Sequence, residues 1–190
     1  MKQIDRKTKE ELIAKHFKEI MVVLGLDVES PSIKDTPDRV ARMYVNEIFA
    51  GLHSPSPKIT VFPNEENYDQ MLVVKDITIF SCCEHHFVPI HGKCHIAYIP
   101  QSKVIGLSKL IRVAQHFSAK PQLQERLTQE IGNHLQKVLA TDNVALVVEA
   151  AHFCCSMRGA RDPNSKTVTS FLGGAFKKQE LRTEFLSHLK

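Results

Sequence analysis

Two short segments of the chain concentrate side chains that bind transition metals. The first reads CCEHH at residues 82–86, and the second reads HFCC at residues 152–155. Together they contain four of the five cysteines and three of the ten histidines. Thiolate and imidazole are ligands that zinc prefers, and a catalytic zinc site keeps one of its four positions open. The two segments therefore predict a reactive metal centre.

Local geometry favours one set of ligands. In a strand, side chains alternate between faces, so His152 and Cys154 are expected to point the same way. Cys83 and His86 are three residues apart, a spacing at which a turn wraps two ligands around one ion. We therefore expect Cys83, His86 and Cys154 to hold zinc, with His85 and His152 beside it as free imidazoles.

Two further thiols leave a second arrangement open. Cys82 or Cys155 would close the coordination shell, and a closed shell of four ligands is typical of structural zinc. Structural sites are most often built from paired Cys-x-x-Cys units, whereas this sequence has spare histidines beside its candidate ligands. This difference favours a catalytic metal.

A cationic helix start is the second candidate binding element. In the segment 106–118, Lys109, Arg112 and His116 share the polar face of a predicted helix whose N-cap is expected at Ser108. Two cations in a first turn oppose the helix dipole unless an anion binds to both, and a solvated helix face is the alternative. Arg158, just after the second metal segment, is a third candidate cation.

Two acidic residues have less certain assignments from the sequence alone. Glu84 lies between candidate metal ligands, where it either steers a ligand or binds substrate. Gln124 and Glu125 follow Pro121 in the first turn of a predicted helix, and a glutamate there usually complements the helix dipole.

Hydrophobic periodicity indicates the elements that position these residues. Apolar residues recur at helical spacing over residues 8–25, and a second helix begins at Thr36-Pro37 with Thr36 as its N-cap. Residues 52–70 are polar and contain three prolines, which predicts a loop. We therefore expect residues 1–70 to form an N-terminal helical region and linker.

The pattern of strands and helices expected over residues 71–190 predicts one α+β catalytic domain. β-branched residues indicate strands at 71–80 and 93–99, with a turn at His91-Gly92 between them. The predicted order is strand–strand–helix–helix–strand–strand. Its later members are helices over 108–118 and from residue 121, and strands over 143–155 and 166–172.

Composition excludes several classes of protein. The 190 residues are 43% hydrophobic and 24% charged, which is ordinary for a globular protein. The net charge is only +4 and cations alternate with acids, so the chain lacks the basic stripe that binds nucleic acid. No apolar run is long enough to span a membrane, and the N-terminus lacks a signal-peptide pattern. The odd cysteine count argues against a disulfide framework, so we expect a cytoplasmic protein.

At this level of detail the sequence resembles the zinc-dependent GTP cyclohydrolase I family. The motifs lie in the same order along nearly the whole chain. They are DTPxRV at 35–40, SxCEHHF at 81–87, GLSK at 106–109, QERLT at 124–128, HxCxxxRG at 152–159 and FLGG at 171–174.

The resemblance implies a fold, an assembly and a reaction. The fold is a tunnelling fold (T-fold): an N-terminal helical pair, then an antiparallel four-stranded sheet with two helices on one face, in the order ββααββ. The assembly is a homodecamer of two pentamers with active sites between subunits. The reaction is zinc-dependent opening of the GTP imidazole ring at C8, with release of formate and reclosure to 7,8-dihydroneopterin triphosphate. This is the first step of pterin biosynthesis, leading to folate or tetrahydrobiopterin.

The resemblance also implies a role for each site residue. Zinc would be held by the same three ligands as above, and His85 and His152 would transfer protons. Gln124 and Glu125 would recognise guanine. The remaining substrate-binding residues would be Glu84, Ser108, Lys109, Arg112 and Arg158.

Three other classes make different predictions. A zinc-stabilised RNA-binding module needs a closed four-ligand site and a basic surface. A nucleobase deaminase needs a His-x-Glu and Pro-Cys-x-x-Cys signature, which this sequence lacks. A tunnelling-fold reductase would need no zinc and would have no use for three clustered histidines. The sequence identifies no regulatory partner protein.

Overall fold

The computed structural model describes residues 4–190, and the chain divides into two compact units, Met1–Ser54 and Pro55–Lys190. The sequence predicts this division after residue 70. It lies earlier because residues 61–63, expected in a loop, form a strand that pairs with residues 103–105 of the second unit. No helix among the described residues is long and apolar enough to cross a membrane.

The first unit is helical. Helix α1 (Arg6–Val23) is capped by Asp5, whose Oδ1 accepts a hydrogen bond from the Thr8 N–H at 3.1 Å. Helix α2 (Thr36–Met43) continues into a π-helical turn, η1 (Tyr44–Ile48), and a 3₁₀ turn, η2 (Ala50–Leu52). Thr36, the expected N-cap, is instead the first helical residue, and Asp35 occupies the cap position.

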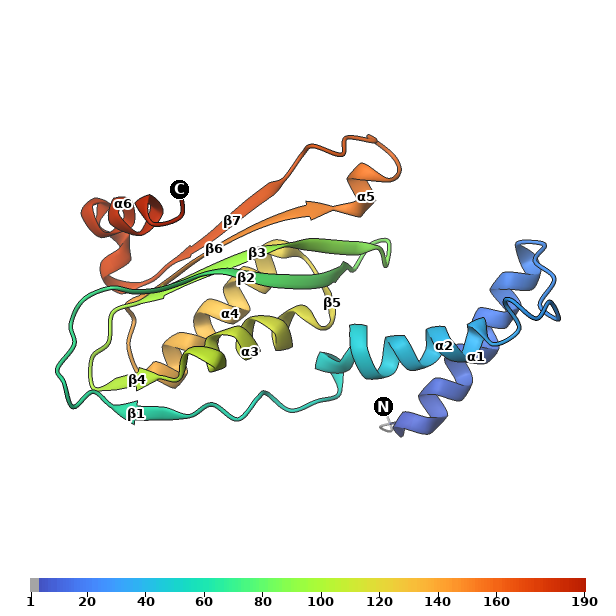
Figure 1. Cartoon of the computed structure of the whole chain (residues 1–190), viewed down its shortest axis with the longest axis horizontal. Helices are drawn as coiled ribbons and strands as arrows, with labels where there is room; N and C mark the ends of the chain where they lie inside the picture. The colour runs from blue at the N-terminus through green and yellow to red at the C-terminus, as the bar shows by residue number, and fades with distance from the viewer. Residues whose placement is uncertain (1–3) are drawn as a thin grey trace. The chain divides into compact units, whose positions relative to one another are not determined.

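The second unit is built on a five-stranded sheet in the order β5-β2-β3-β6-β7 (Figure 1). Its four longer strands pair antiparallel, and the two-residue β5 pairs parallel with β2. The predicted α+β class is therefore confirmed, with an additional edge strand. The bounds are β2 (Leu72–Cys83), β3 (Pro89–Tyr98), β5 (Pro121–Gln122), β6 (Val144–His152) and β7 (Thr167–Leu172). A separate pair consists of β1 (Val61–Pro63) and β4 (Lys103–Ile105).

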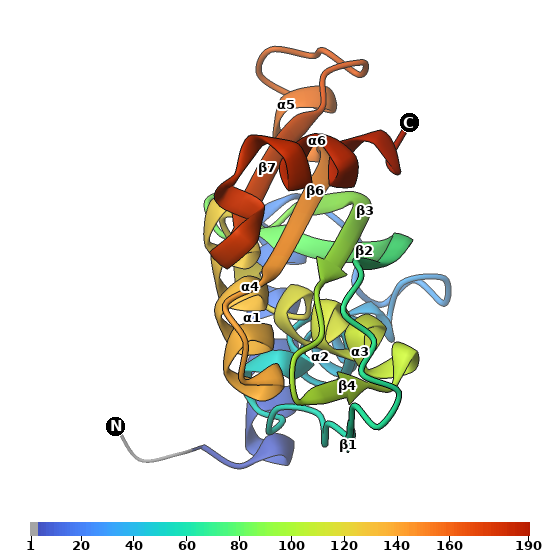
Figure 2. The same cartoon turned by 90° about the vertical axis from the view of Figure 1, so that its left-hand side faces the viewer.

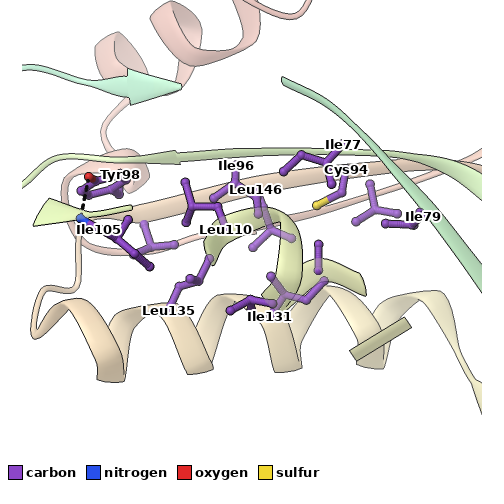
Figure 3. Packing of buried hydrophobic residues seen from close by; sticks show 14 of the residues in the cluster. Ile77, Ile79, Cys94, Ile96, Tyr98, Ile105, Leu110, Ile131, Leu135 and Leu146 are labelled. Atoms are coloured by element: carbon purple, nitrogen blue, oxygen red, sulfur yellow. Dashed lines mark hydrogen bonds between the residues drawn. The ribbon is translucent and has the colours of Figure 1, made fainter. Parts of the chain in front are cut away.

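Two helices cover one face of this sheet, α3 (Leu107–Ser118) and α4 (Gln124–Leu139) (Figure 1). Apolar residues three and four apart on each helix are fully buried against the strands. Figure 3 shows this core, in which the Ile105 N–H donates to the Tyr98 hydroxyl at 3.3 Å. Its buried members include Ile79, Cys94, Ile96, Leu110, Val113, Ile131, Leu135 and Leu146.

The opposite face carries the C-terminal segment, beyond the last predicted strand. A 3₁₀ turn, η3 (Gly174–Lys177), leads into helix α6 (Gln179–Ser187). Phe176 and Phe185 from these two elements are fully buried in contact with each other and with alanines of β3 and β6. Figure 2 shows α6 crossing β6 and β7 on the side away from α4. The sheet is thus covered on both faces at this end.

The prediction of a turn at His91-Gly92 is wrong, because both residues lie inside β3. Glycine is required there by close packing: a Cβ at residue 92 would lie 2.1 Å from the Glu149 carbonyl oxygen of β6. The true turn spans residues 84–88, where Phe87 adopts the left-handed conformation with φ of 54°.

Candidate metal centre

Three donor atoms from two distant segments meet at one end of the sheet. Cys83 is the last residue of β2, His86 lies in the following turn, and Cys154 lies on the short helix α5 (Phe153–Ser156). The two Sγ atoms and one ring nitrogen of His86 lie within 4.8 Å of one another, and the Cys83 Sγ is 3.9 Å from the His86 Nδ1. Figure 1 shows α5 and the β2–β3 turn at the same end of the sheet.

Strand pairing brings these segments together. Ile90 of β3 pairs with His152 of β6, so the helix that follows β6 begins beside the turn that precedes β3. The Cys83 N–H donates to the Val88 carbonyl at 2.9 Å, and the Cys83 carbonyl accepts from the Phe87 N–H at 2.8 Å. The position of Cys83 is thus set by the main chain of the turn.

The route by which Cys154 reaches the cluster differs from the prediction. Strand alternation was expected to place it on the same face as His152, but β6 ends at His152 and Cys154 lies in a helical turn. The alternation rule therefore does not apply to this residue. Its position comes from the change of backbone direction at the end of β6.

The donor set fits zinc. A tetrahedral ion with Zn–S near 2.3 Å and Zn–N near 2.0 Å separates its ligand atoms by about 3.5 to 3.8 Å. The 3.9 Å between Cys83 Sγ and His86 Nδ1 is close to this spacing. Among residues 4–190 this trio is the one group of three such side chains with all donor atoms this close.

Neither extra thiol belongs to the trio. Cys82 is buried, its Sγ lies 4.0 Å from the carbonyl oxygen of Cys83, and burial raises its pKa to about 11. Cys155 is exposed, with its Sγ 4.0 Å from that of Cys154. Burial, with the neighbouring Cys83 thiol, raises the pKa of Cys154 to about 11 as well. A bound cation reverses such a shift by favouring the thiolate.

Two imidazoles adjoin the donor trio. His85 is exposed, and its ring lies 6.3 Å from that of His86 in an edge-on arrangement. His152 is half-buried, and its Nε2 lies 2.7 Å from the Gln124 Oε1. Burial lowers the pKa of His152, and the negative charge of Glu125 partly offsets this effect.

The two predicted guanine-binding residues have different environments. Gln124 is only 1% exposed, and its Nε2 lies within 3.1 Å of three acceptors on β6 and β7. Glu125 is exposed in the first turn of α4, near enough to His152 to act on its pKa. The structure therefore leaves Glu125 accessible to a ligand, whereas the Gln124 side chain is engaged within the protein.

Glu84 forms an ion pair with Arg126 of helix α4. Both of its carboxylate oxygens accept hydrogen bonds from the Arg126 guanidinium, at 2.6 and 2.9 Å. This contact lowers the pKa of Glu84. Forty-two residues separate the pair, so only the folded chain reveals it.

The predicted anion-binding residues do not all join the site within one chain. Ser108, Lys109 and Arg112 lie at the start of α3, next to β4 (Figure 1). Ser108 is not the N-cap, a position that Gly106 occupies. The other end of α3 is the one near the metal centre, since the Ser81 hydroxyl of β2 donates to the Lys120 carbonyl at 3.2 Å. A helix of this length spans about 18 Å.

Arg158 lies at the metal end of the sheet. It follows α5 and is exposed, and its carbonyl accepts a hydrogen bond from the Arg161 N–H at 3.2 Å. One chain thus places Glu125, His85, His152 and Arg158 with the donor trio and leaves the α3 cations at the other end.

The fold and site together define a class: an α+β protein with a Cys/His/Cys group that could hold a metal ion at one end of its sheet. The chain belongs to the GTP cyclohydrolase I family, whose model matches residues 13–190.

Relatives in this family align over almost the whole chain. GTP cyclohydrolase 1 of Enterobacter sp. (strain 638) is 52% identical over 186 residues, covering 97% of this chain and 84% of the relative. The corresponding protein of Erwinia tasmaniensis is 50% identical over 192 residues, covering 100% and 87%. That of Salmonella arizonae is 52% identical over 188 residues, covering 98% and 85%.

Proposed function

We propose that this chain hydrolyses GTP at C8 of the guanine base, releases formate and forms 7,8-dihydroneopterin triphosphate, the first step of pterin biosynthesis. The observation that carries this proposal is the placement of His152 and Glu125 beside the Cys83, His86 and Cys154 donor trio. The names and high identity of the relatives support the choice of GTP.

The residues of the donor trio would hold zinc. When bound there, zinc supplies Lewis-acid activation of water at neutral pH. Cys83 is the most buried of the three, and His86 is exposed, so a metal held there would be accessible to substrate. The donor trio and two imidazoles lie at the same end of the sheet, which supports this role.

His152 is suited to proton transfer. Its half-buried ring has a lowered pKa, so near neutral pH it is mostly unprotonated and can exchange a proton with the purine. In this proposal it accepts the proton that the attacking water loses and then delivers that proton to the ring nitrogen that leaves C8. His85, more exposed, provides a second imidazole for the hydrolysis of the formamide that results.

Glu125 is the proposed guanine-recognition residue. Its carboxylate would accept hydrogen bonds from the ring N1–H and the exocyclic amine of guanine. Adenine has no proton on N1 and no amine at that position, so it would leave the carboxylate unpaired. A site built to hydrogen-bond a substrate N–H discriminates strongly against an analogue that lacks it.

The triphosphate requires a second chain in this proposal. Ser108, Lys109 and Arg112 lie at the far end of α3 from the donor trio, and Arg158 lies at the near end. If all four contact one GTP molecule, some must come from a neighbouring copy. This supports a homo-oligomer with active sites between subunits, which we propose is a decamer of two pentamers of T-fold chains. A cytoplasmic location completes the proposal, since none of the five cysteines is in a disulfide.

Incubation of the purified, zinc-loaded protein with GTP tests the function. We expect formate in the medium and a pterin that becomes fluorescent after oxidation, with ATP giving neither. If neither product forms from GTP and added zinc restores nothing, the proposed reaction is wrong.

A further inference from the structure

The Gln124 side chain joins three elements at one point. Its Nε2 lies 3.0 Å from the Val148 carbonyl of β6, 2.9 Å from the Thr167 carbonyl of β7 and 3.1 Å from the Thr169 Oγ1. Its Oε1 lies 2.7 Å from the Nε2 of His152. Because Gln124 is 1% exposed, water does not compete for these contacts.

These contacts determine which atom of the Gln124 amide is the oxygen and which is the NH₂ nitrogen. A backbone carbonyl can only accept a hydrogen bond, so the amide atom that faces both Val148 and Thr167 must be the NH₂ group. The opposite orientation would place the amide oxygen against two carbonyl oxygens, and none of these three atoms can donate a hydrogen bond. The atom facing His152 is therefore the amide oxygen, which is an acceptor.

The hydroxyl groups behind Gln124 agree with this orientation. The Thr128 hydroxyl donates to the Gln124 main-chain carbonyl at 2.8 Å and lies 2.7 Å from the Thr169 hydroxyl. Since the Thr128 proton is used, Thr169 donates to Thr128 and keeps a lone pair for the Gln124 NH₂ group. The donor and the acceptor of each hydrogen bond in this network are therefore assigned, up to the contact with His152.

An amide oxygen facing the imidazole requires a proton on Nε2. We propose that Gln124 is a positioning residue that holds neutral His152 as its Nε2–H tautomer, so that Nδ1 is the nitrogen that exchanges protons with substrate. The role of His152 as the proton-transfer group rests on the proposed function. Within residues 4–190, the structure gives Nδ1 no hydrogen-bond partner of its own, which leaves it available for that exchange.

Solid-state ¹⁵N NMR of zinc-loaded protein labelled at histidine tests the assignment directly. The His152 signals are identified by their loss in His152→Asn, and the spectrum is recorded at mildly alkaline pH, where the imidazole is neutral. We expect a protonated Nε2 and an unprotonated Nδ1. A protonated Nδ1 in the unmodified protein overturns the proposal whether or not GTP is turned over.

Two variants separate positioning from packing. Gln124→Met and Gln124→Glu both remove the amide donors to β6 and β7, but only the glutamate keeps an oxygen facing Nε2. We expect Gln124→Met to show a mixture of His152 tautomers and a kcat lowered by more than about tenfold with little change in KM, because the wrong tautomer cannot transfer the proton. Gln124→Glu should retain the Nε2–H signal.

The outcomes are distinguishable. Equal tautomer mixtures in both variants would show that the oxygen does not select the tautomer, and the proposal fails. Absence of GTP turnover in the unmodified protein would refute the proposed function while the tautomer spectrum still decides the role of Gln124.

Discussion

Glu84 and Arg126 form a two-point ion pair, with nitrogen–oxygen distances of 2.6 and 2.9 Å, between the β2–β3 turn and helix α4. Such bidentate pairs restrict geometry as well as supplying charge attraction. The turn held in this way carries His85 and His86. The pair therefore ties two imidazoles of the metal centre to the helix that carries Gln124 and Glu125.

Arg126→Gln should weaken zinc binding without removing a ligand. Loss of groups that orient metal ligands typically costs about 10- to 100-fold in affinity, and we expect the lower end because His86 is held indirectly. Competition with a chromophoric chelator measures the change. Lys93→Gln is the matched control, since it breaks a similarly exposed pair with Asp76, of 2.7 Å, elsewhere on the sheet. Equal zinc affinity in both variants would show that the Glu84–Arg126 ion pair does not support zinc binding.

Cys83→Ser should abolish zinc binding but leave the chain folded. The main hydrophobic core lies between the sheet and helices α3 and α4, and it does not include Cys83. Metal analysis and circular dichroism check the two halves of this prediction. Cys82→Ser, at the adjacent buried thiol, should keep its zinc. Unfolding of Cys83→Ser with zinc loss would instead favour a zinc-stabilised binding module.

Glu125→Gln should lower kcat/KM for GTP while zinc content stays normal. Hydrogen bonds to a charged group contribute about 1.5 to 3 kcal/mol, which corresponds to roughly 10- to 150-fold. Steady-state pterin formation gives the ratio. Gln129→Ala removes an exposed side chain one turn further along α4 and should leave the kinetics unchanged. Turnover of Glu125→Gln at the normal rate would exclude this carboxylate from guanine recognition.

Stability should fall as the pH drops below the normal histidine range. Burial lowers the pKa of His134, and its buried Nε2 has no hydrogen-bond partner within residues 4–190. Above about pH 6.5 the His134 ring is neutral in both the folded and the unfolded chain. Below that pH the unfolded chain binds the proton first, so the free energy of unfolding decreases. Thermal melts over a pH series measure this. His134→Leu should flatten the acid slope, and an unchanged slope in this variant would contradict the prediction.

Gly132→Ala should destabilise the fold although alanine favours helices. A Cβ at residue 132 would lie 2.5 Å from the Phe171 ring of β7. The helix-propensity gain is about 1 kcal/mol, and overpacking costs about 1 to 3 kcal/mol. Denaturant unfolding should show a net loss, which an additional Phe171→Leu substitution should partly restore. A more stable Gly132→Ala protein would mean that α4 and β7 have room to separate.

Periodicity and residue type were enough to predict much of the fold. The polar face expected at Lys109, Arg112 and His116 lies on helix α3, opposite the buried Leu110, Val113 and Ala114, and all four longer strands were predicted. The prediction failed where long-range contacts override local signals. Gly92 is typical of a turn, but its small size serves the close approach of β6 to β3. The pairing of β1 with β4 likewise has no local signature.

In the candidate site, too, residue type and spacing were predictive, whereas long-range contacts were not predictable. The cysteine and histidine spacing predicted the members of the donor trio, because metal chemistry selects residue type. The path of Cys154 into that trio was not predictable, since nothing in HFCC indicates that the strand stops at His152. Nor does sequence reveal that Arg126 pairs with Glu84 or that Gln124 is buried, because both depend on where α4 meets the sheet.

The absence of a side chain at Gly92 also affects the spacing of the residues in the candidate metal centre. Residue 92 faces Ala150, two positions before His152 on the same strand. A methyl group there would force β6 away from β3, and the displacement would carry His152 and the cysteine beyond it away from Cys83. The close approach of β3 and β6 at Gly92 therefore helps to set the distance between the two segments of the donor trio, although Gly92 is not one of the three donor residues.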